Sequence, residues 1–172
     1  MSNPIGLTNS AHGASGFTLM EAIVVVALLS ILSVLGVPSL MTTLRNNQSI
    51  AQNNNFIAAL HLARSTAVTR RKPVTVCASS SGTACTANTN WAVGYIVLDG
   101  STVIQAQPAM EGGASFVESA SASTLSFNGY GETSTAYQFT FTPKDCTSAA
   151  VSKRVIAIAV TGRVTTSNTA CP

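Results

Sequence analysis

One carboxylate stands at the entrance of the longest apolar run in this chain of 172 residues. Glu21 is followed by a segment, Ala22 to Leu44, that contains no charged side chain. As a helix this segment would rise roughly 34 Å, slightly more than the ~30 Å hydrocarbon core of a bilayer. An unpaired charge in such surroundings costs on the order of a few kcal/mol, so we expect Glu21 to need a cationic partner.

The four cysteines are the next residues with chemistry of their own. Cys77 and Cys85 bracket a short Ser/Gly/Thr loop, whereas Cys146 and Cys171 bracket the last strands and the C-terminus. This spacing favours two disulfides, Cys77 with Cys85 and Cys146 with Cys171, although four cysteines allow three connectivities. In the chain-entropy model each bridge would contribute roughly 3 kcal/mol of stability to a domain outside the cell.

A zinc site is the alternative use of these cysteines. The spacing from Cys77 to Cys85 is too wide for a zinc knuckle, and neither His12 nor His61 is placed to complete a site. The sequence therefore predicts neither a metal nor a cofactor.

Enzymatic chemistry has weak support. His61, Asp99 and Glu111 are present, but the sequence has no nucleophile elbow, phosphate-binding Gly loop or metal-ligand pattern. With 9% charged and 46% apolar residues, the composition is that of a secreted or surface protein, and the net charge of +3 does not by itself indicate a nucleic-acid partner. A membrane-anchored periplasmic enzyme is an alternative, and we predict no enzyme.

These residues are positioned by a long helix, predicted from about Phe17 to Thr69 and kinked near Pro38. Its second half carries an apolar stripe at three- to four-residue steps that should pack on a sheet, and Asn53 to Asn55 should form a solvated face. The basic run Arg70 to Lys72, followed by Pro73, closes the helix. The stripe comprises Ile50, Phe56, Ile57, Leu60, Ala63, Ala67 and Val68.

Beyond Pro73 the periodicity changes to that of strands. An Asp99-Gly100 turn joins two of them in a hairpin, and further turns are expected at 129–131 and 161–163. A helix followed by short strands predicts an α+β protein with a mostly antiparallel β head. The expected strands are Val74–Cys77, Trp91–Leu98, Thr102–Ile104, Ser115–Glu118, Thr124–Phe127, Tyr137–Phe141 and Arg154–Val160.

The sequence Gly16-Phe17-Thr18-Leu19-Met20-Glu21, followed by the apolar helix, resembles the N-terminus of type IV pilins and type II secretion pseudopilins. The resemblance implies that a prepilin peptidase cuts between Gly16 and Phe17 and that the Phe17 amine is methylated. It also implies that Glu21 pairs with the N-terminal ammonium of a neighbouring subunit, which would neutralise the carboxylate.

The resemblance implies a division of the chain into four parts. Residues 1–16 are a prepilin leader that is removed, although His12 stands there without the usual Lys or Arg. Residues 17–45 form the transmembrane or filament-core helix, and 46–72 its amphipathic second half. Residues 73–172 form the disulfide-braced globular head.

The segment Phe56 to Arg71, with its L-x-x-A-R-S-x-A-V pattern, resembles the FimT and GspH family, as do Val74–Cys77 and Trp91-x-x-Gly94. The resemblance implies the pilin fold and a minor pilin or pseudopilin that primes or caps a type IV pilus or a type II secretion pseudopilus. Such a protein would cross the inner membrane once, with its head in the periplasm, and would then join other pilins near the filament tip.

DNA uptake in natural transformation is the alternative function. Some FimT-like proteins bind DNA through a C-terminal Gly-Arg-x-Arg motif, and this chain has Gly162-Arg163-Val164-Thr165, with Thr165 in place of the second Arg. The candidate contacts to double-stranded DNA are Arg163, Lys153 and Arg154, because phosphate binding needs several cations.

Overall fold

The computed structural model describes residues 16–144, 146–147 and 152–171, and within the long helix it leaves out the side chains of 34–39, 41–42 and 45. Most of the expected leader and the side chain of Pro38 thus lie outside the described residues, and the kink at Pro38 stays a prediction. The chain forms two compact units, Met1–Thr42 and Thr43–Pro172, which are taken separately below.

Helix α1 (Leu19–Arg70) is close to its predicted bounds. It ends in a Schellman motif, in which Lys72 N donates to Ala67 O at 3.2 Å and Arg71 N donates to Val68 O at 3.4 Å. Arg71 holds the left-handed position with φ of 52°, where glycine is usual. The helix therefore stops through backbone geometry as well as through the cations and proline expected from the sequence.

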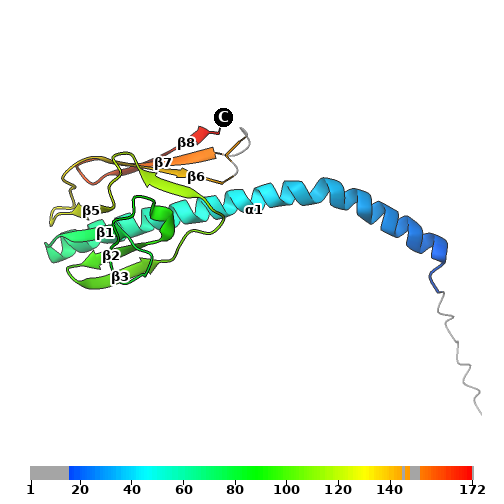
Figure 1. The fold of residues 1–172 in the computed structure, drawn as a ribbon, viewed down its shortest axis with the longest axis horizontal. Coiled ribbons are helices and arrows are strands. Elements are labelled where there is room, and N and C mark those ends of the chain that lie inside the picture. The colour runs from blue at the N-terminus through cyan, green and yellow to red at the C-terminus, as the bar shows by residue number, and fades with distance from the viewer. Residues whose placement is uncertain (1–15, 145, 148–151, 172) are drawn as a thin grey trace, which may run out of the picture. The chain divides into compact units, whose positions relative to one another are not determined.

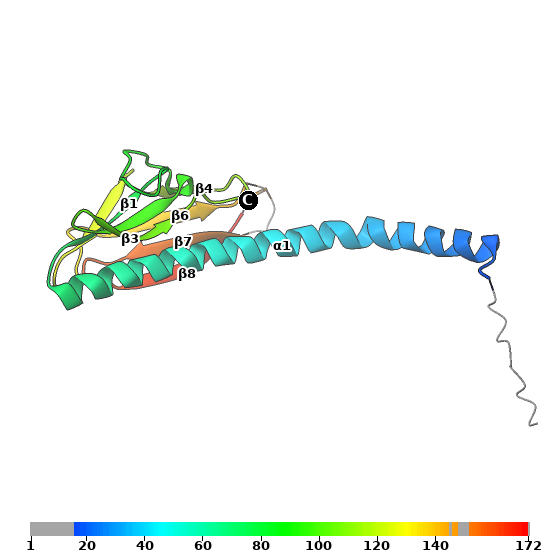
Figure 2. The same ribbon diagram turned by 90° about the horizontal axis from the view of Figure 1, so that it is seen from below.

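The head contains two four-stranded antiparallel sheets (Figures 1 and 2), which lie over the C-terminal half of α1. The first has the order β3-β2-β1-β5 and the second β4-β6-β7-β8. In the first sheet the strands are β1 (Val74–Ala78), β2 (Tyr95–Asp99), β3 (Thr102–Gln107) and β5 (Thr124–Phe127). In the second they are β4 (Ser115–Glu118), β6 (Tyr137–Thr142), β7 (Ser152–Ile158) and β8 (Val164–Ala170).

Two features of the sheets differ from the sequence prediction. Trp91–Val93 forms a short 3-10 helix, η1, instead of the start of a strand, and the Asn90 side chain accepts a hydrogen bond from Ala92 N at its N-terminus. Strand β8 was not predicted, because its residues after Val164 are all exposed and carry no hydrophobic alternation. Strand β8 pairs with β7 because a tight turn joins the two strands, and not because its side chains are buried in the core.

Phe56 lies at the centre of the head. Its ring makes edge-on contacts with aromatic rings from both sheets and from η1. The centroid distances are 5.7 Å to Trp91, 5.1 Å to Tyr95, 4.7 Å to Phe116 and 4.9 Å to Phe139. Through Phe56 the helix thus contacts both sheets and η1 at once.

The buried face of α1 begins earlier than the apolar stripe suggested. Ser49 and Asn53 are buried, so the prediction that Asn53 lies on a solvated face is wrong, whereas Asn54 and Asn55 are exposed. The reason is position: Asn53 lies about one turn and Ser49 about two turns before Phe56, on the helix face that contacts the sheets. Ile50 and Val68, which were assigned to the stripe, are exposed.

Replacing Phe56 by Ala should destabilise the head by about 3–5 kcal/mol, because the change leaves a cavity among four aromatic rings. The full-length protein in detergent would be unfolded with urea and followed by tryptophan fluorescence, since Trp91 contacts Phe56. Leu62→Ala, at an exposed position of the same helix, is the matched control and should cost well under 1 kcal/mol. Equal losses for both variants would contradict this view of the core.

Candidate assembly helix and head sites

The first unit begins with a helix cap. Thr18 precedes α1, its Oγ1 accepts a hydrogen bond from Glu21 N at 3.2 Å, and its carbonyl accepts one from Ala22 N at 3.1 Å. Thr18 thus caps the helix, and Glu21 occupies the third helical position, with the Thr-x-x-Glu spacing of a capping box. The spacing Thr-x-x-Glu could have indicated this from the sequence, but there Glu21 was interpreted through its charge alone.

Glu21 lies in the first turn of α1, where the helix dipole favours a negative charge. The side chain is exposed, as is Phe17, which stands beside the expected cleavage point after Gly16. Among the residues that the structure describes, none forms an ion pair with the Glu21 carboxylate. The cationic partner expected from the sequence is therefore not supplied by the described part of this chain.

The helix that follows Glu21 is apolar on all sides. Every described side chain from Ala22 to Ser33 is exposed in the isolated molecule, although most are large hydrophobics. The two serines are satisfied within the helix, since Ser30 Oγ donates to Ala27 O and Ser33 Oγ to Leu29 O, both at 2.7 Å. A helix that is apolar all round is normally covered by other apolar groups.

A search of the described residues for membrane-spanning helices found no candidate with sufficient length and mean hydropathy.

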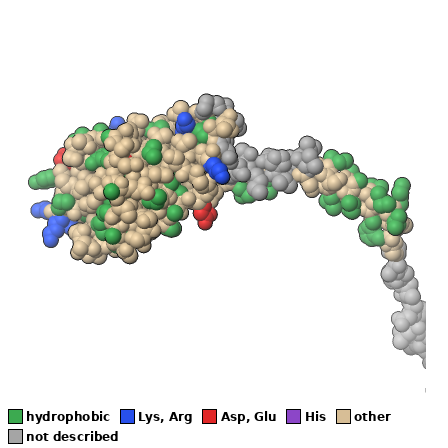
Figure 3. Space-filling view, in the orientation of Figure 1, with side chains coloured by type: hydrophobic (Ala, Val, Ile, Leu, Met, Phe, Trp, Pro, Cys, Tyr) green, Lys and Arg blue, Asp and Glu red, His purple; other side chains and the backbone are tan. Residues whose placement is uncertain are grey.

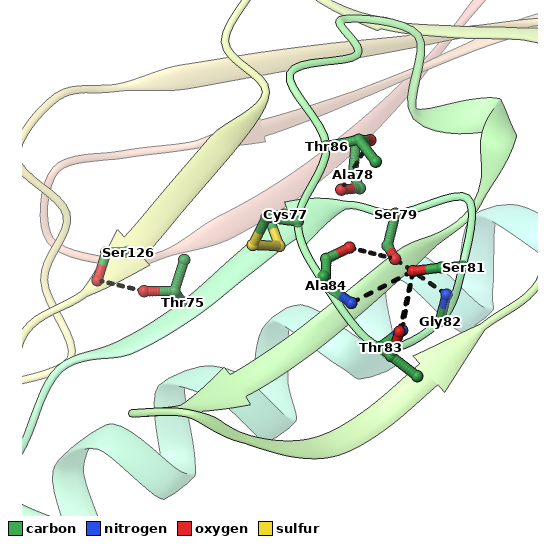
Figure 4. Close-up of a disulfide and its surroundings, with 11 residues drawn as sticks. Thr75, Cys77, Ala78, Ser79, Ser81, Gly82, Thr83, Ala84, Thr86 and Ser126 are labelled. Carbon is green, nitrogen blue, oxygen red and sulfur yellow. Dashed lines mark hydrogen bonds between the residues drawn. A yellow bond between two sulfur atoms is a disulfide. The ribbon is translucent and has the colours of Figure 1, made fainter.

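The cysteines of the head form two disulfides in the structure, Cys77 with Cys85 and Cys146 with Cys171. The first closes a loop that is held by further hydrogen bonds (Figure 4). Ser79 Oγ donates to Ala84 O at 2.7 Å and accepts from Gly82 N at 3.0 Å, while Thr86 N donates to Ala78 O at 2.8 Å. Both bridges use the pairing that the spacing favoured.

Glu118 is a buried carboxylate, which the residue types of its strand do not predict. Burial raises its pKa, but hydrogen bonds from Ala122 N, Gln138 N, Ala120 N and the Ser119 hydroxyl outweigh this and leave the pKa lowered. The carboxylate thereby ties the loop after β4 to strand β6. The distances are 3.1 Å from Ala122 N, 3.3 Å from Gln138 N, 2.8 Å from Ala120 N and 3.0 Å from Ser119 Oγ.

The three cations considered for DNA binding do not lie together. Arg163 follows the turn between β7 and β8, whereas Lys153 and Arg154 pair with Thr169 and Asn168 at the other end of that hairpin. About six residues of strand separate Lys153 from the turn, or about 20 Å. Figure 3 likewise shows the Lys and Arg side chains of the visible face in small separate groups.

The basic run at the end of α1 borders an open pocket. Arg70 forms an ion pair with Asp99, at the tip of the β2–β3 hairpin. The pocket has a volume of about 660 Å³ and is lined by Arg70, Lys72, Pro73, Asp99, Gly100 and Ser101. Within the described part of the chain, no group of three His, Cys, Asp or Glu residues could hold a metal ion.

A helix packed across two antiparallel sheets, with a capped apolar segment before it, defines an α+β pilin fold. A family model described as Type II transport protein GspH matches residues 52–162, which is more than half of the chain. The chain belongs to this family and is a minor pilin or pseudopilin, so the resemblance stated from the sequence is confirmed. The family is one of structural filament subunits.

Solved structures support the same fold. The type IV minor pilin FimU of Pseudomonas aeruginosa strain PAO1 aligns with a TM-score of 0.53 at 20% identity, over 70% of this chain and 90% of that one. A second crystal form of FimU gives a TM-score of 0.51 at 18% identity, over 69% and 92%. At these identities the likeness shows the fold alone. A search of curated protein sequences found no match.

Replacing Glu118 by Gln should destabilise the folded head by about 1–3 kcal/mol at neutral pH, because an amide cannot accept from all these donors. Since folding lowers the pKa of Glu118, its stabilising effect is complete above the ordinary glutamate pKa of about 4.3 and is lost as the pH falls through the lower folded value. Urea unfolding between pH 7 and pH 3 should therefore show the gap between the two proteins narrowing on acidification.

Glu111→Gln is the control for this experiment, because Glu111 is an exposed carboxylate of the same head. It should change stability by less than about 0.5 kcal/mol at any pH. A Glu118→Gln gap that stays constant down to pH 3 would contradict the role given to the ionised carboxylate.

Proposed function

We propose that this protein is a membrane-anchored filament subunit that helps to prime or cap a type IV pilus or a type II secretion pseudopilus. A prepilin peptidase cuts between Gly16 and Phe17, and the Phe17 amine is methylated. The apolar part of α1 first lies in the inner membrane, with the head in the periplasm, and then packs among the helices of other subunits. Membership of the GspH family supports this proposal.

One observation carries the proposal. The described start of α1 exposes large apolar side chains on every side, while the head has a closed aromatic core of its own. At ~25 cal/mol per Å² of buried apolar surface, covering such a helix gives a strong drive toward lipid or toward other helices. The head has a core of its own, so the apolar surface that drives assembly in this proposal is that of the helix.

Glu21 gives the assembly its register in this proposal. Its carboxylate is exposed, held in the first helical turn and close in sequence to the new N-terminus at Phe17. Once a neighbouring subunit excludes water from the Glu21 carboxylate, burying this charge costs free energy unless a cation pairs with it. The ammonium of the neighbour's first residue is such a cation in this proposal, because in each subunit it lies only four residues before Glu21.

Two substitutions at Glu21 separate the pairing from the helix cap. Gln also serves at the third position of a capping box but carries no charge, whereas Ala removes both functions. We expect Glu21→Gln and Glu21→Ala to lower incorporation into sheared filaments to a similar degree, at least tenfold, while the membrane fraction keeps normal amounts. Immunoblots of both fractions measure this, and mass spectrometry of each protein should show Phe17 as the first residue.

Normal incorporation of Glu21→Gln would contradict the charge pairing and leave the cap as the role of Glu21. A mature first residue other than Phe17 would contradict the processing step itself.

DNA binding is a second candidate function, favoured by the exposed Arg163 on the β7–β8 turn. With Lys153 and Arg154 at the far end of the hairpin, few phosphates can be contacted at once, so binding should be weak and sensitive to salt. The purified protein in detergent should retard double-stranded DNA at 20 mM salt, and Arg163→Ala should weaken this severalfold more than Lys153→Ala. No retardation at low salt would remove this candidate.

A further inference from the structure

Two turns of the head share one hydrogen-bond pattern. In the turn Asn128–Glu132, Gly131 N donates to Asn128 O at 2.9 Å and Asn128 N donates to Glu132 O at 2.8 Å. In the turn Ala159–Arg163, Gly162 N donates to Ala159 O at 2.7 Å and Ala159 N donates to Arg163 O at 2.9 Å. In both, a glycine with φ between 74° and 79° holds the fourth position, as in three-residue hairpin loops.

Arg64 of α1 binds both turns at once. Its Nε donates to Gly131 O and its Nη2 donates to Thr161 O, each at 2.9 Å. The turns also contact each other closely, because a Cβ added to Gly162 would lie 1.9 Å from Gly131 O. Charge-assisted hydrogen bonds from one guanidinium to two loops fix their relative positions.

The first turn also rests on the end of α1. A Cβ added to Gly129 would lie 2.8 Å from the carbonyl carbon of Arg71, and one added to Gly131 would lie 2.8 Å from a methyl group of Val68. Arg71 is itself held in the left-handed conformation by the Schellman motif. Tyr130 lies between these two glycines, so the backbone on each side of it packs against the end of α1.

This arrangement exposes apolar, aromatic and cationic side chains side by side, and we name this surface the twin-turn tip. Tyr130 is 85% exposed, Val160 50% and Val68 46%, and the cations Arg71 and Arg163 are exposed beside them. Among the described residues, neither arginine forms an ion pair. Tyr and Arg are the residues most often found at the energetic centres of protein interfaces, and a rigid platform lowers the entropy lost on binding.

We propose that the twin-turn tip is the docking surface for the head of a different filament subunit, one that presents carboxylates around an apolar recess. This inference rests on the proposed function. The apolar side chains and the nearby Glu132 favour a protein partner over a nucleic acid, because a phosphate backbone needs several cations and no carboxylate. Arg71 and Arg163, which are exposed and form no ion pair within the described residues, favour a partner surface that is acidic.

A second copy of this chain is a poor match for the tip. Each described acidic residue of the head is already engaged: Asp99 pairs with Arg70, and Glu118 is buried under its own donors. Glu111 accepts a hydrogen bond from Gln48, and Glu132 accepts one from Asn128 beside the tip. The described part of the head therefore offers no group of free carboxylates to match two arginines, and we assign the carboxylates to a different subunit.

Site-specific photo-crosslinking in cells that build the filament tests this inference. Benzoylphenylalanine at Tyr130 of the full-length protein should crosslink on irradiation to another filament subunit, which mass spectrometry of the adduct identifies. The matched control is the same group at Val117 of β4, which is 38% exposed away from the tip. We expect at least a tenfold higher yield at Tyr130 than at Val117.

Charge reversal supplies the second measurement. Arg163→Glu should lower the crosslink at Tyr130 at least fivefold, whereas Lys153→Glu, at the other end of the β7–β8 hairpin, should leave it unchanged. Equal yields at both probe positions, an adduct with DNA, or an unaffected yield in Arg163→Glu would overturn the inference while the protein still sediments with filaments. Absence from the filament fraction in all variants would instead show that the proposed function has failed.

Discussion

The seating of Phe56 between the two sheets is the contact on which the head depends. One ring from the helix contacts aromatic rings of β2, β4, β6 and η1, so neither sheet has a complete core without α1. The small residues Ala59, Ala63 and Ala67 on the same buried face let the helix approach the strands closely. The helix that is proposed to pack against other subunits is therefore also part of the core of the head, and the head cannot release it without unfolding.

The same helix meets two kinds of surroundings. From Ser49 onward one face of the helix is buried and the other is solvated, which is the usual arrangement for a helix on a sheet. In its described first part all sides are apolar and exposed, and its serines bond to their own backbone. The head is thus stabilised by contacts within the chain, whereas the start of the helix is left to be covered by other molecules. This division of labour suits a subunit that folds first and assembles afterwards.

Polar groups in the head join segments that are distant along the chain. Glu118 collects donors from its own loop and from β6, and Arg64 connects α1 with two turns that follow it by 67 and 97 residues. Arg64 belongs to the L-x-x-A-R-S-x-A-V segment of α1, in which Leu60, Ala63 and Ala67 are buried. The pattern therefore combines a packing face with one side chain that organises loops.

Local chemistry was sufficient to predict much of this protein from its sequence. The apolar run with one acid, the stop at Arg70 to Pro73 and the Asp99-Gly100 hairpin depend on neighbours a few residues apart, and the structure contains the corresponding helix and hairpin. The two disulfides join cysteines 8 and 25 residues apart, as their order along the chain favoured. The burial of Asn53, the ionised Glu118 and the clamp formed by Arg64 were decided by the tertiary structure alone. Each depends on partners brought together from separate strands and turns, and the residue types give no sign of which distant backbone groups will face them.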